Sequence, residues 1–165
     1  MELDLTEVES PIGEVIVAET VKGVCAVAFP RERTRMKALL EKRFGAVTFR
    51  KAEGRGAADV RRYFRGDVAA LDAIRVDTGG TEFQEKVWIA LRAIPAGETR
   101  SYAELARAVG RPTAVRAVAR ANATNPVPII VPCHRVVRTD GGIGGYGGGV
   151  QRKRWLLRHE GLVLA

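Results

Sequence analysis

One short segment of the chain combines the residue types needed for cysteine chemistry. Cys133 follows Pro132 and precedes His134 and Arg135. A thiolate, not a thiol, is the nucleophile, and nearby cations lower a cysteine pKa from about 8.5 toward neutrality or below. The proline restrains the backbone before the cysteine, and the histidine can help to hold a thiolate. The segment therefore predicts an activated cysteine nucleophile.

The backbone around this cysteine is expected to be irregular. Side chains at adjacent positions point to opposite sides of a regular strand, but Pro126, Pro128 and Pro132 disfavour regular structure, so the thiol and imidazole can meet directly or through a water. A catalytic histidine also needs a third group to orient it. Glu160 and Asp140 are both candidates for that carboxylate.

Few other residues could share this chemistry, since the remaining cysteine and histidine are Cys25 and His159. Cys25 lies in an apolar run, which predicts a buried structural cysteine. Two histidines and two distant cysteines match no zinc spacing, so we expect no metal and no cofactor. The cysteine count favours a reducing cytoplasm. No signal peptide or membrane-spanning run is recognisable, so no membrane partner is expected.

Positive charge is concentrated in the second half of the chain. The net charge is +8 over 165 residues, and residues 82–165 hold 13 Lys and Arg against 6 Asp and Glu. A basic segment beside a nearly neutral one indicates a polyanionic partner, although a solvated arginine-rich surface has the same composition.

Turn residues divide the chain into elements. In the first half, glycine-containing turns separate short β-rich runs, and helical spacing follows. The expected strands cover 3–8, 14–18, 24–29 and 47–49, and the expected helices 31–44 and 57–64. Residues 77–80 predict a linker. We therefore expect an α/β (α+β) protein, with a small domain of antiparallel sheet and helices over 1–77 and a mostly helical domain over 78–165.

The second half contains a helix pair upstream of the cysteine. Thr81 can cap the start of a helix that comes before this pair in the sequence. Ser101 with Glu104 forms a capping-box pattern at the start of the first helix of the pair. Residues 110–112 interrupt it, and Thr113 can cap a second helix over 114–123. This is the helix-turn-helix pattern. Arg116 would lie on its basic face; an ordinary helical hairpin is the alternative.

Glycines and a last helix complete the chain. The glycine-rich run at 141–149 predicts a tight loop whose backbone closely approaches another group. A final helix over 150–160 is expected to pack Trp155 and Leu156 inward and to end at Gly161.

The segment over 125–137, NPVPIIVPCHRVV, strongly resembles the active-site signature of O6-alkylguanine-DNA alkyltransferases. Matching flanks at 101–102, 116–118, 144–146 and 155–161 extend the resemblance over 82–165. The family's two-domain layout also fits the N-terminal strands. The family implies direct-reversal DNA repair of O6-alkylguanine and O4-alkylthymine.

The resemblance implies a role for each residue near the cysteine. Cys133 would accept the alkyl group by in-line displacement, with guanine as leaving group. His134 would deprotonate it through a water, Glu160 would hold the imidazole tautomer, and Asn125 would brace this network. Tyr146 would donate toward the base as negative charge develops. The thioether product is stable, so each protein would act once.

The resemblance also implies double-stranded DNA as the partner. The recognition helix would enter the minor groove and the alkylated base would be flipped out. Arg116 would fill the vacated space, and Tyr102 would crowd the flanking phosphate. Further expected DNA contacts are Ser101, Thr113, Ala117, Arg120, Asn122 and Arg135, and expected base-pocket residues are Pro128, Val131, Gly147 and Gly148. For Arg135 the alternative is an ion pair in the core or on the surface. We expect a monomer without an obligate protein partner, which can cluster on DNA.

The sequence departs from the family at two points. Gly147 stands where relatives commonly carry a small hydroxyl residue or alanine, which leaves the pocket breadth open. The N-terminal half has no histidine, so the structural zinc of some relatives is not expected.

Two other interpretations of the function remain. A lesion-binding module without transfer would not need Cys133, and a cysteine hydrolase would leave the basic helix pair unexplained.

Overall fold

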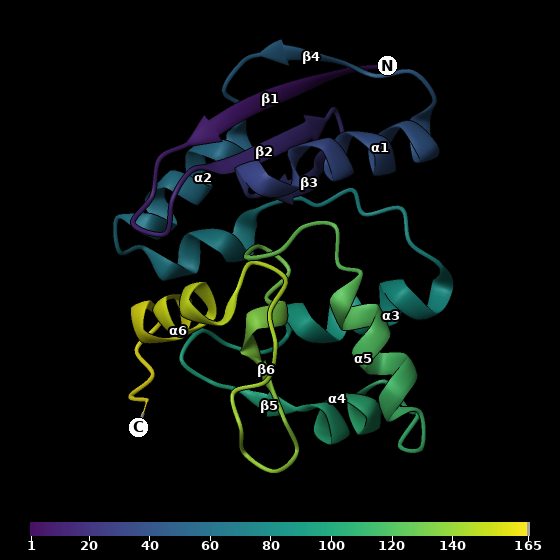
Figure 1. The fold of residues 1–165 in the computed structure, drawn as a ribbon, viewed down its shortest axis with the longest axis vertical. Coiled ribbons are helices and arrows are strands. Elements are labelled where there is room, and N and C mark those ends of the chain that lie inside the picture. Colours follow the sequence, from purple (N-terminus) through teal and green to yellow (C-terminus); the bar gives the residue numbers. More distant parts are fainter. Residues whose placement is uncertain (165) are drawn as a thin grey trace. The chain divides into compact units, whose positions relative to one another are not determined.

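The computed structural model describes residues 1–164, which divide into two compact units (Figure 1). The first unit contains residues 1–79 and 126–130, and the second contains residues 80–125 and 131–164. The segment over 126–130 thus packs with the first unit although it lies within the second half of the sequence; the backbone N–H of Val27 donates to the carbonyl of Pro126 at 3.0 Å. Within residues 1–164, no helix is long and apolar enough to span a bilayer.

A four-stranded sheet in the order β3-β2-β1-β4 forms the centre of the first unit. Strands β1 (Glu2–Val8), β2 (Val15–Thr20) and β3 (Gly23–Ala28) pair antiparallel, as expected from the glycine turns between them. Strand β4 (Thr48–Lys51) instead pairs parallel to β1. Helix α1 (Arg33–Phe44) makes the crossover between β3 and β4, and such a connection returns the chain in the same direction.

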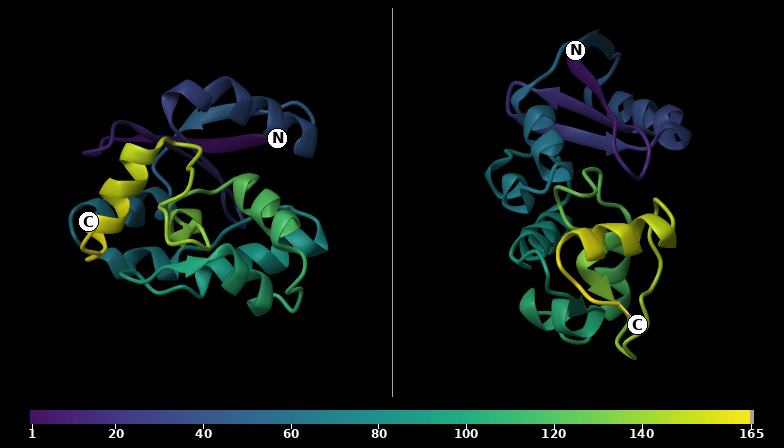
Figure 2. Two further views of the ribbon diagram at one scale, coloured as in Figure 1. Left: turned by 60° about the horizontal axis from the view of Figure 1, so that its bottom comes forward. Right: turned by 90° about the vertical axis from the view of Figure 1, so that its left-hand side faces the viewer.

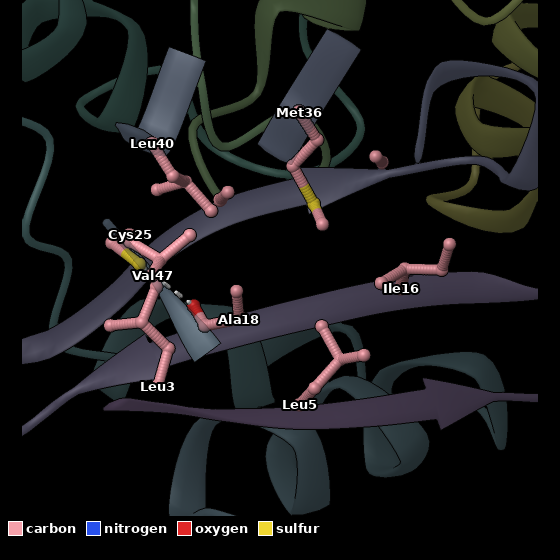
Figure 3. Packing of buried hydrophobic residues seen from close by; sticks show 10 residues of the cluster. Leu3, Leu5, Ile16, Ala18, Cys25, Met36, Leu40 and Val47 are labelled. Atoms are coloured by element: carbon pink, nitrogen blue, oxygen red, sulfur yellow. Dashed lines mark hydrogen bonds between the residues drawn. The ribbon is translucent and has the colours of Figure 1, made fainter. Parts of the chain in front are cut away.

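Apolar side chains of this sheet pack under α1 (Figure 3). Leu3 and Leu5 alternate along β1 and share a face, where Met36 and Leu40 of α1 cover them. Cys25 belongs to the same cluster, and its Sγ lies 3.4 Å from the carbonyl of Ala18. Burial raises the pKa of this thiol to about 11. Cys25 is therefore the buried, unreactive cysteine expected from its apolar neighbours.

The first unit is completed by α2 (Arg55–Phe64) and two 3₁₀ helices (Pro30–Glu32 and Val68–Ala73). The buried carboxylate of Glu19 accepts hydrogen bonds from the backbone N–H of Gly56 and Ala57 at the start of α2. The expected linker is partly fixed, because Asp77 accepts a 2.7 Å hydrogen bond from Thr20 and forms an ion pair with Arg43.

The second unit is mostly helical (Figures 1 and 2). Its helices are α3 (Glu82–Arg92), α4 (Tyr102–Ala108), α5 (Val115–Ala123) and α6 (Val150–His159). Helices α3, α4 and α5 pack against one another, and Trp88 Nε1 donates to the carbonyl of Ala121 at 2.9 Å. The short strands β5 (Arg100–Ser101) and β6 (Val136–Val137) pair parallel. The sequence pattern did not predict this pair, because each strand has only two residues.

Helix ends test the capping predictions directly. Thr81 and Ser101 each form a complete capping box, with Gln84 and Glu104 as partners. Thr113 does not cap α5; the N-cap is Ala114, and no side chain bonds to the first turn. On α6, Leu156 is buried as expected, whereas Trp155 is only half-buried and stacks on His159 with ring centroids 4.5 Å apart.

Candidate active site

Two consecutive tight turns present Cys133. Pro132 has φ −81° and ψ 66°, and the N–H of Cys133 donates to the carbonyl of Val131 at 2.8 Å. This is the geometry of an inverse γ-turn, which suits the fixed φ of proline. A 3₁₀ helix (Cys133–Arg135) follows, with the N–H of Arg135 donating to the carbonyl of Pro132 at 2.9 Å. The backbone is irregular here, as the prolines predicted.

His134 is held by Glu160, at the C-terminal end of α6. The His134 Nε2 lies 2.8 Å from Glu160 Oε2, and both side chains are fully buried. The other candidate carboxylate, Asp140, is exposed; its oxygens accept from Arg138 at 2.8 Å and from the N–H of Gly142 at 2.9 Å. The structure therefore selects Glu160 as the partner of the imidazole.

The charge state of this pair follows from its surroundings. Burial alone would raise the pKa of Glu160, but hydrogen bonds from His134 and Arg135 lower it to about 2. Burial lowers the pKa of His134 below 6.5. Near neutral pH the carboxylate is thus ionised and the imidazole neutral. An ionised carboxylate only accepts hydrogen bonds, so Nε2 carries the ring hydrogen and Nδ1 keeps its lone pair. Nδ1 has no hydrogen-bond partner among the described residues.

Cys133 rests as a neutral thiol. Burial raises its pKa, and this effect exceeds the lowering by a hydrogen bond from Asn125 and by the charge of Lys153. The sequence-based expectation of a lowered thiol pKa is wrong for the free protein, because that expectation left burial out. Asn125 also donates to the carbonyl of Val131 at 2.7 Å, so one amide contacts both the thiol and the turn that presents it.

The glycine-rich loop brings Tyr146 to the same site. Its ring packs edge-on against His134, with centroids 6.4 Å apart. Its hydroxyl is buried and has no partner within the described chain, and burial raises its pKa well above 10. A neutral phenol of this kind can donate one hydrogen bond to a bound group.

Lys153 is a residue of this site that the sequence interpretation missed. Its side chain is fully buried, and its Nζ donates to the carbonyls of Val136 at 2.7 Å and Gly145 at 3.2 Å. It thereby connects β6 to the residue before Tyr146. Burial lowers its pKa to about 8. One signal was available, because Lys153 lies three residues before the buried Leu156 and so shares its helix face.

The basic residues of α5 lie on an exposed face. Arg116, Ala117 and Arg120 are exposed, whereas Val118 faces the core. An open hollow of about 540 Å³ lies beside this face and is lined by Tyr102 and Arg116, together with Val115, Ala119, Arg138, Thr139 and Asp140. Charged and aromatic groups thus surround a concave surface in the second unit.

Several residues expected to contact DNA or to line the base pocket are buried or bonded to other groups. Arg135 is 3% exposed and bonds to Glu160, so it cannot reach DNA, which corrects the sequence interpretation. Asn122 is buried with its Oδ1 unpartnered among the described residues. Ser101 is half-buried and Thr113 exposed. Val131 is buried, Gly148 half-buried and Gly147 exposed; Pro128 belongs to the first unit and remains a sequence prediction.

Among residues 1–164, no group of three or more His, Cys, Asp or Glu side chains is placed to hold a metal ion.

Comparison with known proteins identifies the family. Residues 82–162 match the model of the 6-O-methylguanine DNA methyltransferase DNA-binding domain. A methylated-DNA–protein-cysteine methyltransferase of Salmonella typhimurium is 42% identical over 163 residues, covering 96% of this chain and 95% of that protein. One from Methanosarcina barkeri is 40% identical over 153 residues, covering 93% and 94%.

Solved structures agree with these relatives. The crystal structure of Mycobacterium tuberculosis OGT in complex with DNA has a TM-score of 0.79 and 37% identity, covering 97% of this chain and 92% of that one. The O6-methylguanine-DNA methyltransferase of Pyrococcus kodakaraensis has a TM-score of 0.69 and 29% identity, covering 96% and 99%. The chain belongs to the methylated-DNA–protein-cysteine methyltransferase family.

Proposed function

We propose that this chain repairs O6-alkylated guanine in duplex DNA by transferring the alkyl group to Cys133. The observation that carries the proposal is the buried thiol of Cys133, adjacent in sequence to His134, whose pairing with Glu160 leaves Nδ1 unpartnered among the described residues. Family membership and the basic face of α5 support it. The thiol of Cys25, with a pKa near 11, is a poor competitor.

The reaction is a displacement at the alkyl carbon. The thiol proton passes toward Nδ1 of His134, the sulfur attacks the carbon, and the carbon–O6 bond breaks with its electron pair going to guanine. Guanine takes up one proton and the His134 imidazolium gives up the one it received, so the hydrogen lost from the thiol is balanced by the hydrogen gained by guanine. The sulfur ends as a stable thioether, and no other cysteine lies near Cys133 in the sequence, so each protein would act once. We infer that Tyr146 donates to the base as its negative charge grows, and that Asn125 holds the thiol in place.

The α4–α5 pair would bind DNA as a helix-turn-helix through the minor groove. The exposed Arg116 and Arg120 would contact DNA, and Ala117 allows close approach of the backbone. Because the target base is stacked inside the duplex, it must be flipped out at a cost of a few kcal/mol. Arg116 would fill the space, and Tyr102 would press on the flanking phosphate. Both residues line the same hollow.

The accepted substrates depend on the glycine loop. Gly147 is exposed, and a Cβ added there would meet nothing within 4 Å among the described atoms. We infer that O4-alkylthymine is a second substrate. We also infer that the protein works in the cytoplasm, because the reaction needs both DNA and a free thiol.

A serine replacement separates chemistry from binding. We expect Cys133→Ser to bind duplex DNA containing O6-methylguanine with wild-type affinity and to transfer no methyl group, because a serine hydroxyl is a far weaker nucleophile. The matched control is Cys25→Ser, which removes the other thiol and keeps transfer. Loss of both binding and transfer in a folded Cys133→Ser would show that Cys133 is a structural residue.

A further inference from the structure

Arg135 and His134 share one buried carboxylate. Arg135 Nε and Nη2 donate to Oε1 and Oε2 of Glu160, each at 2.9 Å, and Nη1 donates to the carbonyl of Ile94 at 2.7 Å. His134 Nε2 lies 2.8 Å from the same Oε2. The Glu160 side chain is fully buried, and that of Arg135 is 4% exposed. The guanidinium fork therefore fixes both the position and the charge of the carboxylate.

The charge of Glu160 decides which ring nitrogen of His134 carries the hydrogen and which carries the lone pair. An ionised carboxylate can only accept, whereas a protonated one can also donate. If Glu160 gained a proton, it could donate to Nε2, and the ring hydrogen would then lie on Nδ1. Nδ1 could no longer take a proton from the thiol. Keeping Glu160 ionised thus keeps Nδ1 basic.

We propose that Arg135 is a positioning residue that makes Glu160 an obligate hydrogen-bond acceptor. It thereby keeps the ring hydrogen of His134 on Nε2 and the lone pair on Nδ1. This rests on the proposed transfer to Cys133. Arg135 acts only through Glu160 and His134. The buried fork takes the place of the DNA contact that the sequence suggested for this arginine.

The pH profile of methyl transfer depends on the charged groups around His134. The titratable and charged groups around His134 are Cys133, Arg135, Tyr146, Lys153 and Glu160. The charges of Arg135 and Lys153 disfavour a proton on the His134–Glu160 pair, while Glu160 favours one on the imidazole. Removing the Arg135 charge therefore makes proton uptake by the pair easier, and activity is lost at a higher pH.

The test is the pH dependence of single-turnover methyl transfer by the full chain, using duplex DNA with O6-methylguanine. We expect the acid limb of Arg135→Met to move to higher pH by about one unit or more, because an adjacent cation typically lowers a pKa by this much. Arg135→Lys keeps the positive charge, so we expect the midpoint of its acid limb to stay close to that of the wild type. The matched control, Arg158→Met, removes an exposed arginine of α6 and leaves the midpoint unchanged.

A folded Arg135→Met with the wild-type midpoint would overturn the proposal, since a purely structural role changes stability and not the midpoint. Removal of Arg135 leaves the buried charge of Glu160 without this partner and can prevent folding. A second test therefore uses the wild-type chain. Nitrogen-15 NMR of labelled histidine should show hydrogen on Nε2 and a bare Nδ1 for His134 at neutral pH. Hydrogen on Nδ1 would equally overturn it.

Failure of the repair function itself would look different. In that case the wild-type chain would leave Cys133 unmethylated. If only the Arg135 proposal fails, the wild type still transfers the methyl group. In that case either Arg135→Met has the wild-type midpoint, or His134 carries its ring hydrogen on Nδ1.

Discussion

At Cys133, burial and neighbouring groups act in opposite directions on the thiol pKa, and burial has the larger effect. His134 is likewise neutral at rest, because burial lowers its pKa. Thiol and imidazole are thus both uncharged before DNA binds. In the proposed reaction, transfer of the proton from Cys133 to His134 creates two charges in a buried site, so groups that stabilise those charges are expected to set the rate. Lys153 is one such group, and Glu160 is another.

Lys153→Met should slow methyl transfer about tenfold or more, the change that about 1.4 kcal/mol of lost stabilisation produces. The substitution removes a positive charge acting on Cys133 and the connection between Val136 and Gly145. Single-turnover rates at saturating DNA measure this effect, with Arg158→Met as the control for loss of one charge. An unchanged rate in the folded variant would exclude a role for Lys153 in the reaction.

Glu160 should make stability depend on pH in the acid range. Its folded-state pKa is lowered from 4.5 to about 2, so its contribution to stability is complete above about pH 4.5 and is lost as the pH falls toward 2. Urea unfolding between pH 5 and pH 3 should show this loss in the wild type and a flatter dependence in Glu160→Gln. The same slope in both proteins would contradict the assignment.

At the scale of elements, local signals in the sequence predicted more than long-range ones. Capping boxes at Thr81 and Ser101 are formed by residues three apart, so the sequence alone identified them. The carboxylate partner of Arg135 is 25 residues away and its carbonyl partner is 41 away. No local pattern carries those contacts, so the sequence leaves a DNA contact and an ion pair both open for Arg135 and does not identify its partners. The parallel pairing of β4 was missed for the same reason.

Helix caps give a paired prediction. Thr81→Ala should lower the free energy of unfolding by about 1 kcal/mol, because Thr81 accepts from the N–H of Gln84 at the start of α3. Thr113→Ala should change it by less than about 0.5 kcal/mol, because Thr113 makes no cap at α5. Urea titration of both variants measures the difference, and equal losses would contradict the cap assignment.

At the scale of the whole molecule, charge is unevenly distributed along the chain. Most of the net charge of +8 lies in residues 82–165, which also contain Cys133. DNA binding that depends on such charge weakens as salt rises, because counterions are released from the phosphates. We therefore expect the excess of positive charge to bring duplex DNA to the half of the chain that contains Cys133.

Arg116→Ala should slow repair of O6-methylguanine in duplex DNA more than transfer from the free base, since only the duplex requires a flipped-out base to be replaced. Arg116 is exposed and lines the hollow beside Tyr102. The two rates are compared with those of Arg158→Ala, which loses the same charge elsewhere. Equal slowing of both reactions by Arg116→Ala would exclude a role in base flipping.

The proposed repair consumes Cys133 in one alkyl transfer. Its most direct measurement is a peptide mass map after incubation with excess duplex DNA containing O6-methylguanine, combined with counting of repaired guanines. We predict one methyl group on Cys133, none on Cys25, and one guanine restored per protein molecule. An unmodified Cys133 with restored guanine, or several guanines restored per protein, would contradict the account.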